Sequence, residues 1–156
     1  MLFALQLHSR PYNGVMRAYA ILVLCVLTVA AFAQVTTPKM GSADRTAMMN
    51  ALRVPIEKAV KQKVQFKVNY LKMSNGWAFM KGIPQQKGGK PINYRKTPFQ
   101  EDIDAGAFDD WVCALFHKKN GKWVLVTHVL GATDVPYVTW PDDYHAPRGI
   151  FDMPRG

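Results

Sequence analysis

Residues 110–130 read DWVCALFHKKNGKWVLVTHVL and contain two apolar runs on either side of Asn120-Gly121. A two-residue turn of type I′ needs positive φ at both central residues, a conformation that asparagine and glycine adopt readily. The stretch therefore predicts a β-hairpin with its turn at Asn120-Gly121. We expect the rest of the chain to cover or extend this hairpin.

A second hairpin is predicted around Asn75-Gly76. Before that turn, residues 64–73 read VQFKVNYLKM and begin by alternating apolar and polar side chains, which is typical of a half-buried strand. The chain returns along residues 77–83. The side chains expected on the buried face are those of Val64, Phe66, Val68 and Tyr70, joined by Trp77 and Phe79.

A helix is predicted ahead of both hairpins, and Ser42 or Asp44 can cap its N-terminus. Its apolar stripe repeats at the helical period and consists of Met48, Leu52, Ile56 and Ala59. Pro55 removes a backbone donor, so we expect either a kink or two short helices that meet near residues 53–54.

One helix followed by two antiparallel hairpins predicts an α+β domain, with a kinked N-terminal helix packed on an antiparallel sheet. By analogy of element order, such shapes include the cystatin-like and nuclear-transport-factor-2-like folds. A helical turn is expected near residues 101–105. The tail contains Pro141, Pro147 and Pro154, so it cannot form a long regular element, and its aromatic side chains suggest that it wraps the domain.

The N-terminal segment has the features of an export signal. Residues 18–33 read AYAILVLCVLTVAAFA, carry no charge, follow Arg17 and end in Ala31-Phe32-Ala33. A signal peptide has this basic flank, short apolar core and small-x-small cleavage site. The run is shorter than the roughly 20 residues of a spanning helix, so we favour cleavage over the alternative of an uncut membrane anchor.

The predicted divisions are a signal peptide at 1–33, a linker at 34–41, a single domain at 42–140 and a proline-rich tail at 141–156. Met16, directly before Arg17, is a more usual start than Met1, and we expect it to be the true initiator. Export places the protein in the periplasm or outside the cell, with no membrane span after cleavage. Cys113 is then the single cysteine of the mature chain, so an internal disulfide is excluded.

Charge is uneven along the chain. Two of the 20 basic residues, Arg10 and Arg17, lie in the leader, so residues 34–156 hold 18 bases and 11 acids, a net charge of +7. Thirteen of these bases precede residue 97. Outside the cytoplasm such a basic surface meets anionic lipid or cell-wall polymer more readily than nucleic acid, although solubility alone is the simpler explanation.

Several segments of the chain resemble a group of small exported proteins of Gram-negative bacteria. These are ALRVPIEKAVKQKVQFKVNYL, WAFMKGIPQ, GAFDDWVCALF and GATDVPYVTW, which together fall within residues 44–140. The most distinctive motifs are Trp77-Ala78-Phe79 and Thr133-Asp134-Val135-Pro136. The group has no established activity, so the resemblance implies export and a single domain and transfers no catalytic residue.

Cys113 and His128 form the sharpest catalytic hypothesis. An Asn120-Gly121 turn pairs Lys119 with Lys122, and uninterrupted pairing then places Cys113 opposite His128, within about 5 Å between Cβ atoms. A thiol beside an imidazole can become a thiolate nucleophile. The simpler interpretation is that Cys113 is a buried side chain of the core with no catalytic role. In addition, a shift of the strand register by one residue would move its partner to the other face of the sheet.

The same register has a consequence for the opposite face of this hairpin. It pairs Phe116 with Leu125, Ala114 with Thr127 and Val112 with Val129. Both faces are then largely apolar. One takes the helix, and the other needs a cover from the tail or from a second subunit, so a homodimer is an open alternative.

Other reactive side chains give weak signals. The carboxylate of Asp134 is expected to accept hydrogen bonds from the backbone of the turn after the central hairpin. The alternative is that this carboxylate lies at the mouth of a cavity. His117, His128 and His145 lack the short spacing of a metal site, so no metal is predicted. No motif predicts a cofactor.

Two hypotheses of function follow. The first is an exported, non-catalytic module that binds a protein or an anionic envelope component, with Lys87, Lys90, Arg95 and Lys96 as candidate ligand-binding residues. The second is a small periplasmic enzyme with a pocket between helix and sheet, using Cys113, His128 or Asp134. The absence of a specific catalytic motif favours the first.

Overall fold

The computed structural model describes residues 34–95 and 97–153 of the 156-residue chain, and these belong to one unit of the fold. The predicted signal peptide at 1–33, the expected start at Met16 and the candidate residue Lys96 lie outside the described residues.

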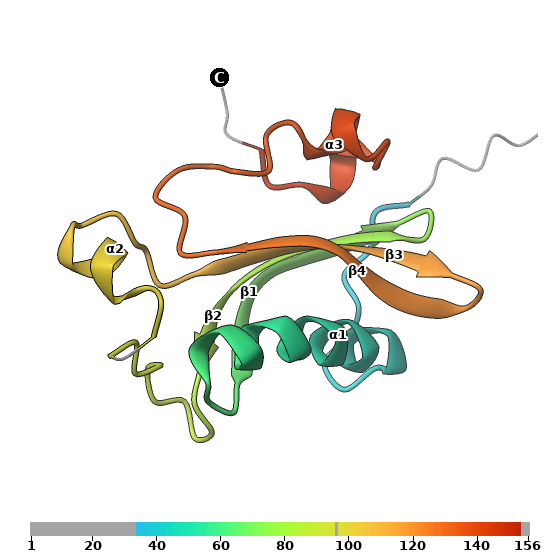
Figure 1. Ribbon diagram of the computed structural model, residues 1–156. Coiled ribbons are helices and arrows are strands. Elements are labelled where there is room, and N and C mark those ends of the chain that lie inside the picture. The colour runs from blue at the N-terminus through green and yellow to red at the C-terminus, as the bar shows by residue number, and fades with distance from the viewer. Residues whose placement is uncertain (1–33, 96, 154–156) are drawn as a thin grey trace, which may run out of the picture. The chain divides into compact units, whose positions relative to one another are not determined.

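A four-stranded antiparallel sheet forms the centre of this unit (Figure 1). Its strands are β1 (Gln65–Ser74), β2 (Trp77–Gln85), β3 (Val112–Lys119) and β4 (Lys122–Leu130), and they neighbour one another in sequence order. Helix α1 (Ala43–Val60) packs on one face of the sheet. The predicted α+β class, with a helix on a sheet built from two hairpins, is thus confirmed.

Both predicted turns are confirmed at the backbone. Asn75 and Gly76 have φ values of 51° and 75°, and Asn120 and Gly121 have 49° and 77°. Positive φ at two successive residues is the requirement of a type I′ turn, which matches the twist of the strands it joins. Because β2 and β3 run antiparallel with Trp77 opposite His117, the two turns lie at the same end of the sheet.

Helix α1 begins where the sequence predicts. Ser42 is the N-cap, and its hydroxyl accepts a hydrogen bond from the backbone N–H of Arg45 at 3.3 Å. The helix is continuous through Pro55, so the alternative of two short helices is wrong. Its fully buried side chains are Met48, Leu52, Ile56 and Val60, and the last of these takes the place expected for Ala59.

Each hairpin contains one β-bulge that the alternating sequence pattern does not reveal. In the first, Val68 pairs with Gly82 and Tyr70 with Lys81, so Asn69 is the extra residue. A bulge moves the side chains beyond it to the other face of the sheet. Val68 therefore packs toward α1, while Tyr70 packs on the opposite face with Trp77 and Phe79. The expectation that Val68 and Tyr70 share a face is wrong.

The second bulge lies in β4. Lys119 pairs with Lys122 and Phe116 with Leu125 as predicted, but Leu115 then pairs with Thr127, which makes Val126 the extra residue. Every pair beyond this point is shifted by one. The expected partners of Ala114 and Val112 are therefore wrong, because Ala114 faces His128 and Val112 faces Leu130.

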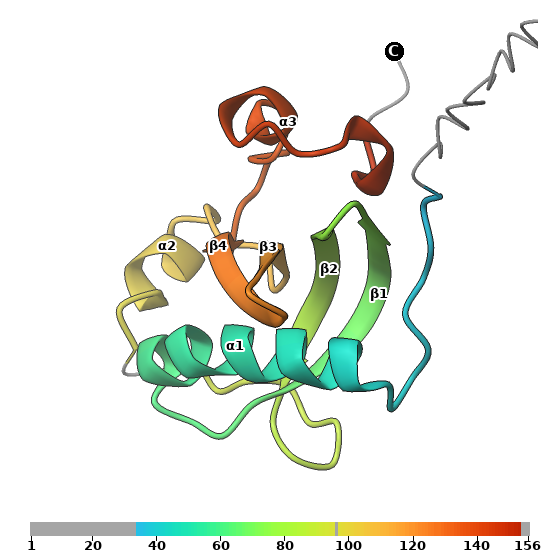
Figure 2. The ribbon, with the colours of Figure 1, turned by 90° about the vertical axis from the view of Figure 1, so that its right-hand side faces the viewer.

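Two separate apolar layers cover the two faces of the sheet. The helix-side core consists of Met48, Leu52, Ile56, Val60, Val64, Leu71, Ala78, Met80, Ile92, Val112, Ala114 and Phe116. The tail-side core consists of Phe79, Cys113, Leu115, Tyr137, Trp140, Ala146, Ile150 and Phe151. Figure 2 shows α1 and α3 on opposite sides of the strands, as does Figure 1.

The C-terminal segment covers the second face of the sheet. It contains two short elements, α3 (Trp140–Asp143) and the 3₁₀ helix η1 (Arg148–Ile150), joined by irregular chain. Its buried aromatic side chains surround the ring of Phe79, with ring centres 4.6 Å away for Tyr137 and 4.8 Å for Phe151. The tail thus provides the cover that the sequence requires for this face. The expected helical turn between the hairpins is α2 (Gln100–Asp104).

Candidate functional site

Cys113 and His128, the predicted catalytic pair, do not face each other. Cys113 pairs with Val129, and His128 pairs with Ala114. Directly paired residues share a face, and Ala114 belongs to the helix-side core whereas Cys113 belongs to the tail-side core. The bulge at Val126 therefore separates the thiol and the imidazole by the thickness of the sheet, and the predicted pairing is wrong.

The environments of these two side chains also differ. Cys113 is fully buried, and burial raises the pKa of its thiol to about 12. A thiol with such a pKa stays protonated near neutral pH, so it is not an activated nucleophile. Burial lowers the pKa of His128, which keeps its half-buried ring neutral.

Asp134, the third candidate, lies exposed in the irregular chain after β4. It is absent from the linings of the three hollows described below. The structure therefore does not bring Cys113, His128 and Asp134 together.

A hollow of about 330 Å³ opens beside the β1 bulge, and we call it the bulge pocket. Its lining comes from four separate segments and consists of Asn69, Tyr70, Lys81, Gly82, Trp111 and Asp152. Tyr70 and Trp111 also contact the tail-side core, so the pocket lies on that face of the sheet. None of these six residues was a candidate in the sequence, because only the bulge and the folded tail bring them together.

The centre of the bulge pocket is an ion pair. The Nζ of Lys81 lies 2.6 Å from Oδ2 of Asp152 and donates to the hydroxyl of Tyr137 at 3.3 Å. Tyr137 in turn donates to the backbone carbonyl of Asp152 at 2.9 Å. Burial acts to lower the pKa of Lys81, but its hydrogen bonds with Asp152 and Tyr137 outweigh burial, and the net pKa is raised. Lys81 is thus a fixed cation and a poor base.

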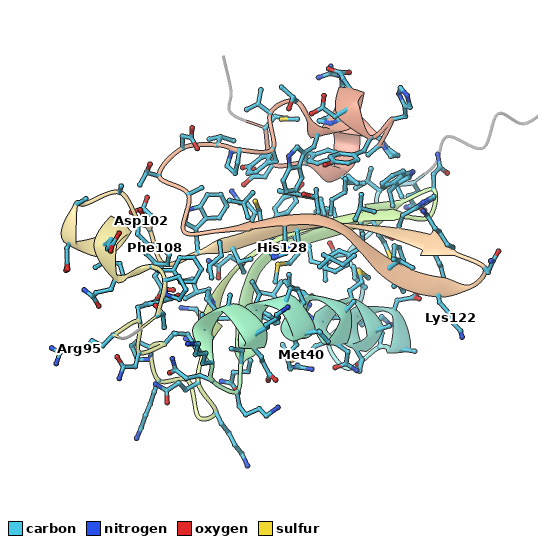
Figure 3. All side chains as sticks on the ribbon, in the orientation of Figure 1. Met40, Arg95, Asp102, Phe108, Lys122 and His128 are labelled. Atoms are coloured by element: carbon cyan, nitrogen blue, oxygen red, sulfur yellow. The ribbon has the colours of Figure 1, made fainter. Side chains whose placement is uncertain are left out.

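A second region, at the far end of the sheet from the Asn-Gly turns, is strongly basic. Two hollows of about 220 and 360 Å³ lie there, around the C-terminal end of α1. Their linings include five basic residues, which are Arg53, Lys61, Lys63, Lys87 and Arg95. We call these residues, together with exposed Lys90 of the neighbouring loop, the basic end. Figure 3 shows Arg95 and Lys122 at opposite ends of the molecule.

Hydrogen bonds fix the backbone of the basic end. Gln62 donates to the carbonyl of Asn93 at 2.6 Å and accepts from the N–H of Asn93 at 3.1 Å. The N–H of Gln86 donates to the carbonyl of Lys90 at 2.8 Å and closes the loop. The lysines therefore project from a defined loop. Candidate residues Lys87, Lys90 and Arg95 are all exposed and belong to this region.

One acid, Glu57, is found in the lining of these two hollows. Its carboxylate is 2.8 Å from Nζ of Lys63 and accepts from the N–H of Val64 at 3.0 Å. These hydrogen bonds lower the pKa of Glu57, so it stays ionised and its charge is largely matched by Lys63. For the other basic residues of the region, no ion pair is found within the described part of the chain.

Two features are absent from the described residues. No helix among them is both long and apolar enough to cross a membrane. In the same part of the chain, no group of three or more histidine, cysteine, aspartate or glutamate side chains is arranged to hold a metal ion.

Comparisons of the chain with protein-family models, with curated proteins and with solved structures found no match. The function is therefore inferred from the geometry of the bulge pocket and of the basic end.

Proposed function

We propose that the protein is an exported, non-catalytic α+β module that binds an anionic polymer of the cell envelope through its basic end. The observation that carries this proposal is the group of six basic side chains, of which Lys63 alone forms an ion pair among the described residues; the same carboxylate, Glu57, also interacts electrostatically with Arg53. Uncompensated cations on a fixed backbone attract polyanions and steer their approach.

Export rests on the sequence of residues 17–33, with its basic flank, uncharged core and Ala31-Phe32-Ala33 end. A periplasmic or extracellular location makes envelope polymers the accessible polyanions.

The alternative, an enzyme with a pocket between helix and sheet, has less support. Side chains of the helix-side core fill the space between α1 and the sheet. The bulge pocket lies on the other face, and neither His128 nor Asp134 lines it. We therefore favour the binding module over the enzyme.

The test is a binding measurement with purified lipopolysaccharide at salt concentrations from about 50 to 500 mM, a range over which screening of exposed charges becomes strong. We expect affinity to fall steeply as salt rises. Binding that is indifferent to salt would rule out the electrostatic mechanism.

Matched charge reversals localise the effect. The double variant Lys87→Glu with Lys90→Glu changes the charge of the basic end by the same amount as Lys119→Glu with Lys122→Glu changes that of the β3–β4 turn. All four side chains are exposed, so both variants should fold. We expect the first variant to lose binding and the second to retain most of it. Equal losses would show that only net charge matters.

A further inference from the structure

We propose that the bulge pocket is a second binding site, independent of the basic end, and that it takes a ring of a neutral sugar. Three properties of the pocket support this ligand class: its shape, its balanced charge and its two aromatic walls.

The shape depends on two neighbouring strands. The bulge in β1 makes Asn69 an extra, exposed residue at the rim, while Gly82 lies opposite Val68 on β2. A Cβ at position 82 would approach the backbone oxygen of Lys67 to 2.7 Å, so no other residue fits there without a shift of the backbone. Gly82 lines the hollow with its backbone, and the volume of about 330 Å³ is large enough for a small ligand.

The charge of the pocket is balanced. Lys81 and Asp152 neutralise each other at 2.6 Å, so a charged ligand gains little net attraction and must disturb this pair. An ammonium group has three donors, and the structure shows two of them used, toward Asp152 and Tyr137. The carboxylate of Asp152 and the amide of Asn69 add further acceptors and donors. Sugar hydroxyls both donate and accept, and they match such a mixed set.

The aromatic walls are held in place. The indole N–H of Trp111 donates to the carbonyl of Ala132 at 2.5 Å, and its ring meets that of Tyr137 edge to face at 6.4 Å. The ring of Tyr70 packs against that of Phe79 in a tilted arrangement, with ring centres 6.1 Å apart. Aromatic side chains combine an apolar ring surface with a polar tip. Such a surface can pack against the C–H face of a sugar ring while the polar groups bind its hydroxyls.

The test is a titration of ¹⁵N-labelled protein, purified after expression of the full 156-residue chain, with three neutral trisaccharides: cellotriose, maltotriose and the trimer of N-acetylglucosamine. We expect at least one of them to shift the amide signals of Asn69 and Gly82 and the indole signal of Trp111. Absence of shifts well above millimolar concentration, or shifts confined to other regions, would overturn the proposal.

Two variants and a matched control sharpen the result. Asn69→Ala removes an exposed amide, and Asp152→Asn removes the carboxylate, and we expect each to weaken binding by about tenfold. The control is Asp142→Asn, which breaks a comparable ion pair with Arg148 at 2.6 Å outside the pocket and should leave affinity unchanged. The spectrum of each free variant reports whether it is folded. Unchanged affinity in both folded pocket variants would contradict the assignment.

Two further measurements separate this site from the basic end. Sugar binding should be insensitive to salt and should survive the double variant Lys87→Glu with Lys90→Glu. Stronger binding of trigalacturonate, an anionic trisaccharide, than of all three neutral sugars would overturn the neutral assignment. Failure of lipopolysaccharide binding leaves these outcomes unaffected, so the two proposals fail separately.

Discussion

Cys113 and His128 lie on opposite faces of the same sheet, because the extra residue Val126 shifts the pairing of β3 and β4 by one position. Without that residue they would be direct neighbours. A single β-bulge thus decides that the thiol belongs to a structural core and does not become part of a catalytic pair.

The first prediction concerns the reactivity of Cys113. Burial raises the pKa of its thiol to about 12, so the thiol is protonated near neutral pH. Its full burial also keeps reagents away from the sulfur atom. We expect no labelling of Cys113 by iodoacetamide between pH 7 and about pH 9 in the native protein, and complete labelling in denaturant. Peptide mapping by mass spectrometry distinguishes Cys113 from Cys25. Rapid native labelling would show that the tail-side core opens or that the thiol is activated.

The second prediction concerns the contact between α1 and the β3–β4 hairpin. Asp44 accepts hydrogen bonds from Lys118 at 2.9 Å and from the indole of Trp123 at 2.7 Å. These bonds, that from Lys118 first, lower the pKa of Asp44 below its ordinary value of 3.8. The stabilisation is therefore present above about pH 4 and is lost as pH falls through the lowered pKa.

Asp44→Asn should reduce the free energy of unfolding by about 0.5–1 kcal/mol at pH 7, because the partners are partly exposed and screened. Urea unfolding at pH 7 and at about pH 2.5 measures the change. The difference between wild type and variant should shrink at the lower pH. A constant difference would mean that the carboxylate charge is not involved.

The third prediction tests the close approach of β1 and β2 at the bulge. Gly82→Ala places a Cβ 2.7 Å from the backbone oxygen of Lys67, and neither strand can move freely within the sheet. We expect a loss of about 1–3 kcal/mol in the free energy of unfolding. Gly149→Ala is the control, since its Cβ would meet only Cγ2 of Val35 at 3.1 Å, a side chain at the surface. Equal effects of the two variants would contradict the argument.

The fourth prediction tests whether the tail stabilises the fold. Ile150 in η1 is fully buried in the tail-side core, so Ile150→Ala should cost about 2–4 kcal/mol of unfolding free energy. Val138, in the same segment, is 48% exposed, and Val138→Ala should change stability by less than about 0.5 kcal/mol. Denaturant unfolding of both variants gives the comparison. A small effect at Ile150 would indicate that the tail is only loosely held.

Local signals allowed much of the fold to be predicted. The Asn-Gly turns, the Ser42 cap and the stripe of Met48, Leu52 and Ile56 each depend on residues close together in sequence. Such patterns report backbone preference and periodicity directly. They locate the helix and both hairpins without any knowledge of long-range contacts.

The candidate site could not be predicted in the same way. Alternation of apolar and polar residues continues through Asn69, so nothing in the pattern reveals the bulge that turns Tyr70 to the other face. In β4, Leu125, Val126 and Val129 are all apolar and give no sign of register. Asp152 reaches the pocket only because an irregular tail folds back over the sheet, and irregular chain has no period to detect.

The order of synthesis gives the tail a further significance. All four strands precede it in the chain, so the hairpins can form while Phe79 and Leu115 still lack the residues that bury them. Phe151 follows all four strands in the chain, so it can cover Phe79 only after both hairpins have been synthesised. Until then the sheet exposes an apolar surface to which chaperones or other unfolded chains can bind, and a truncation that removes the tail would leave that surface uncovered.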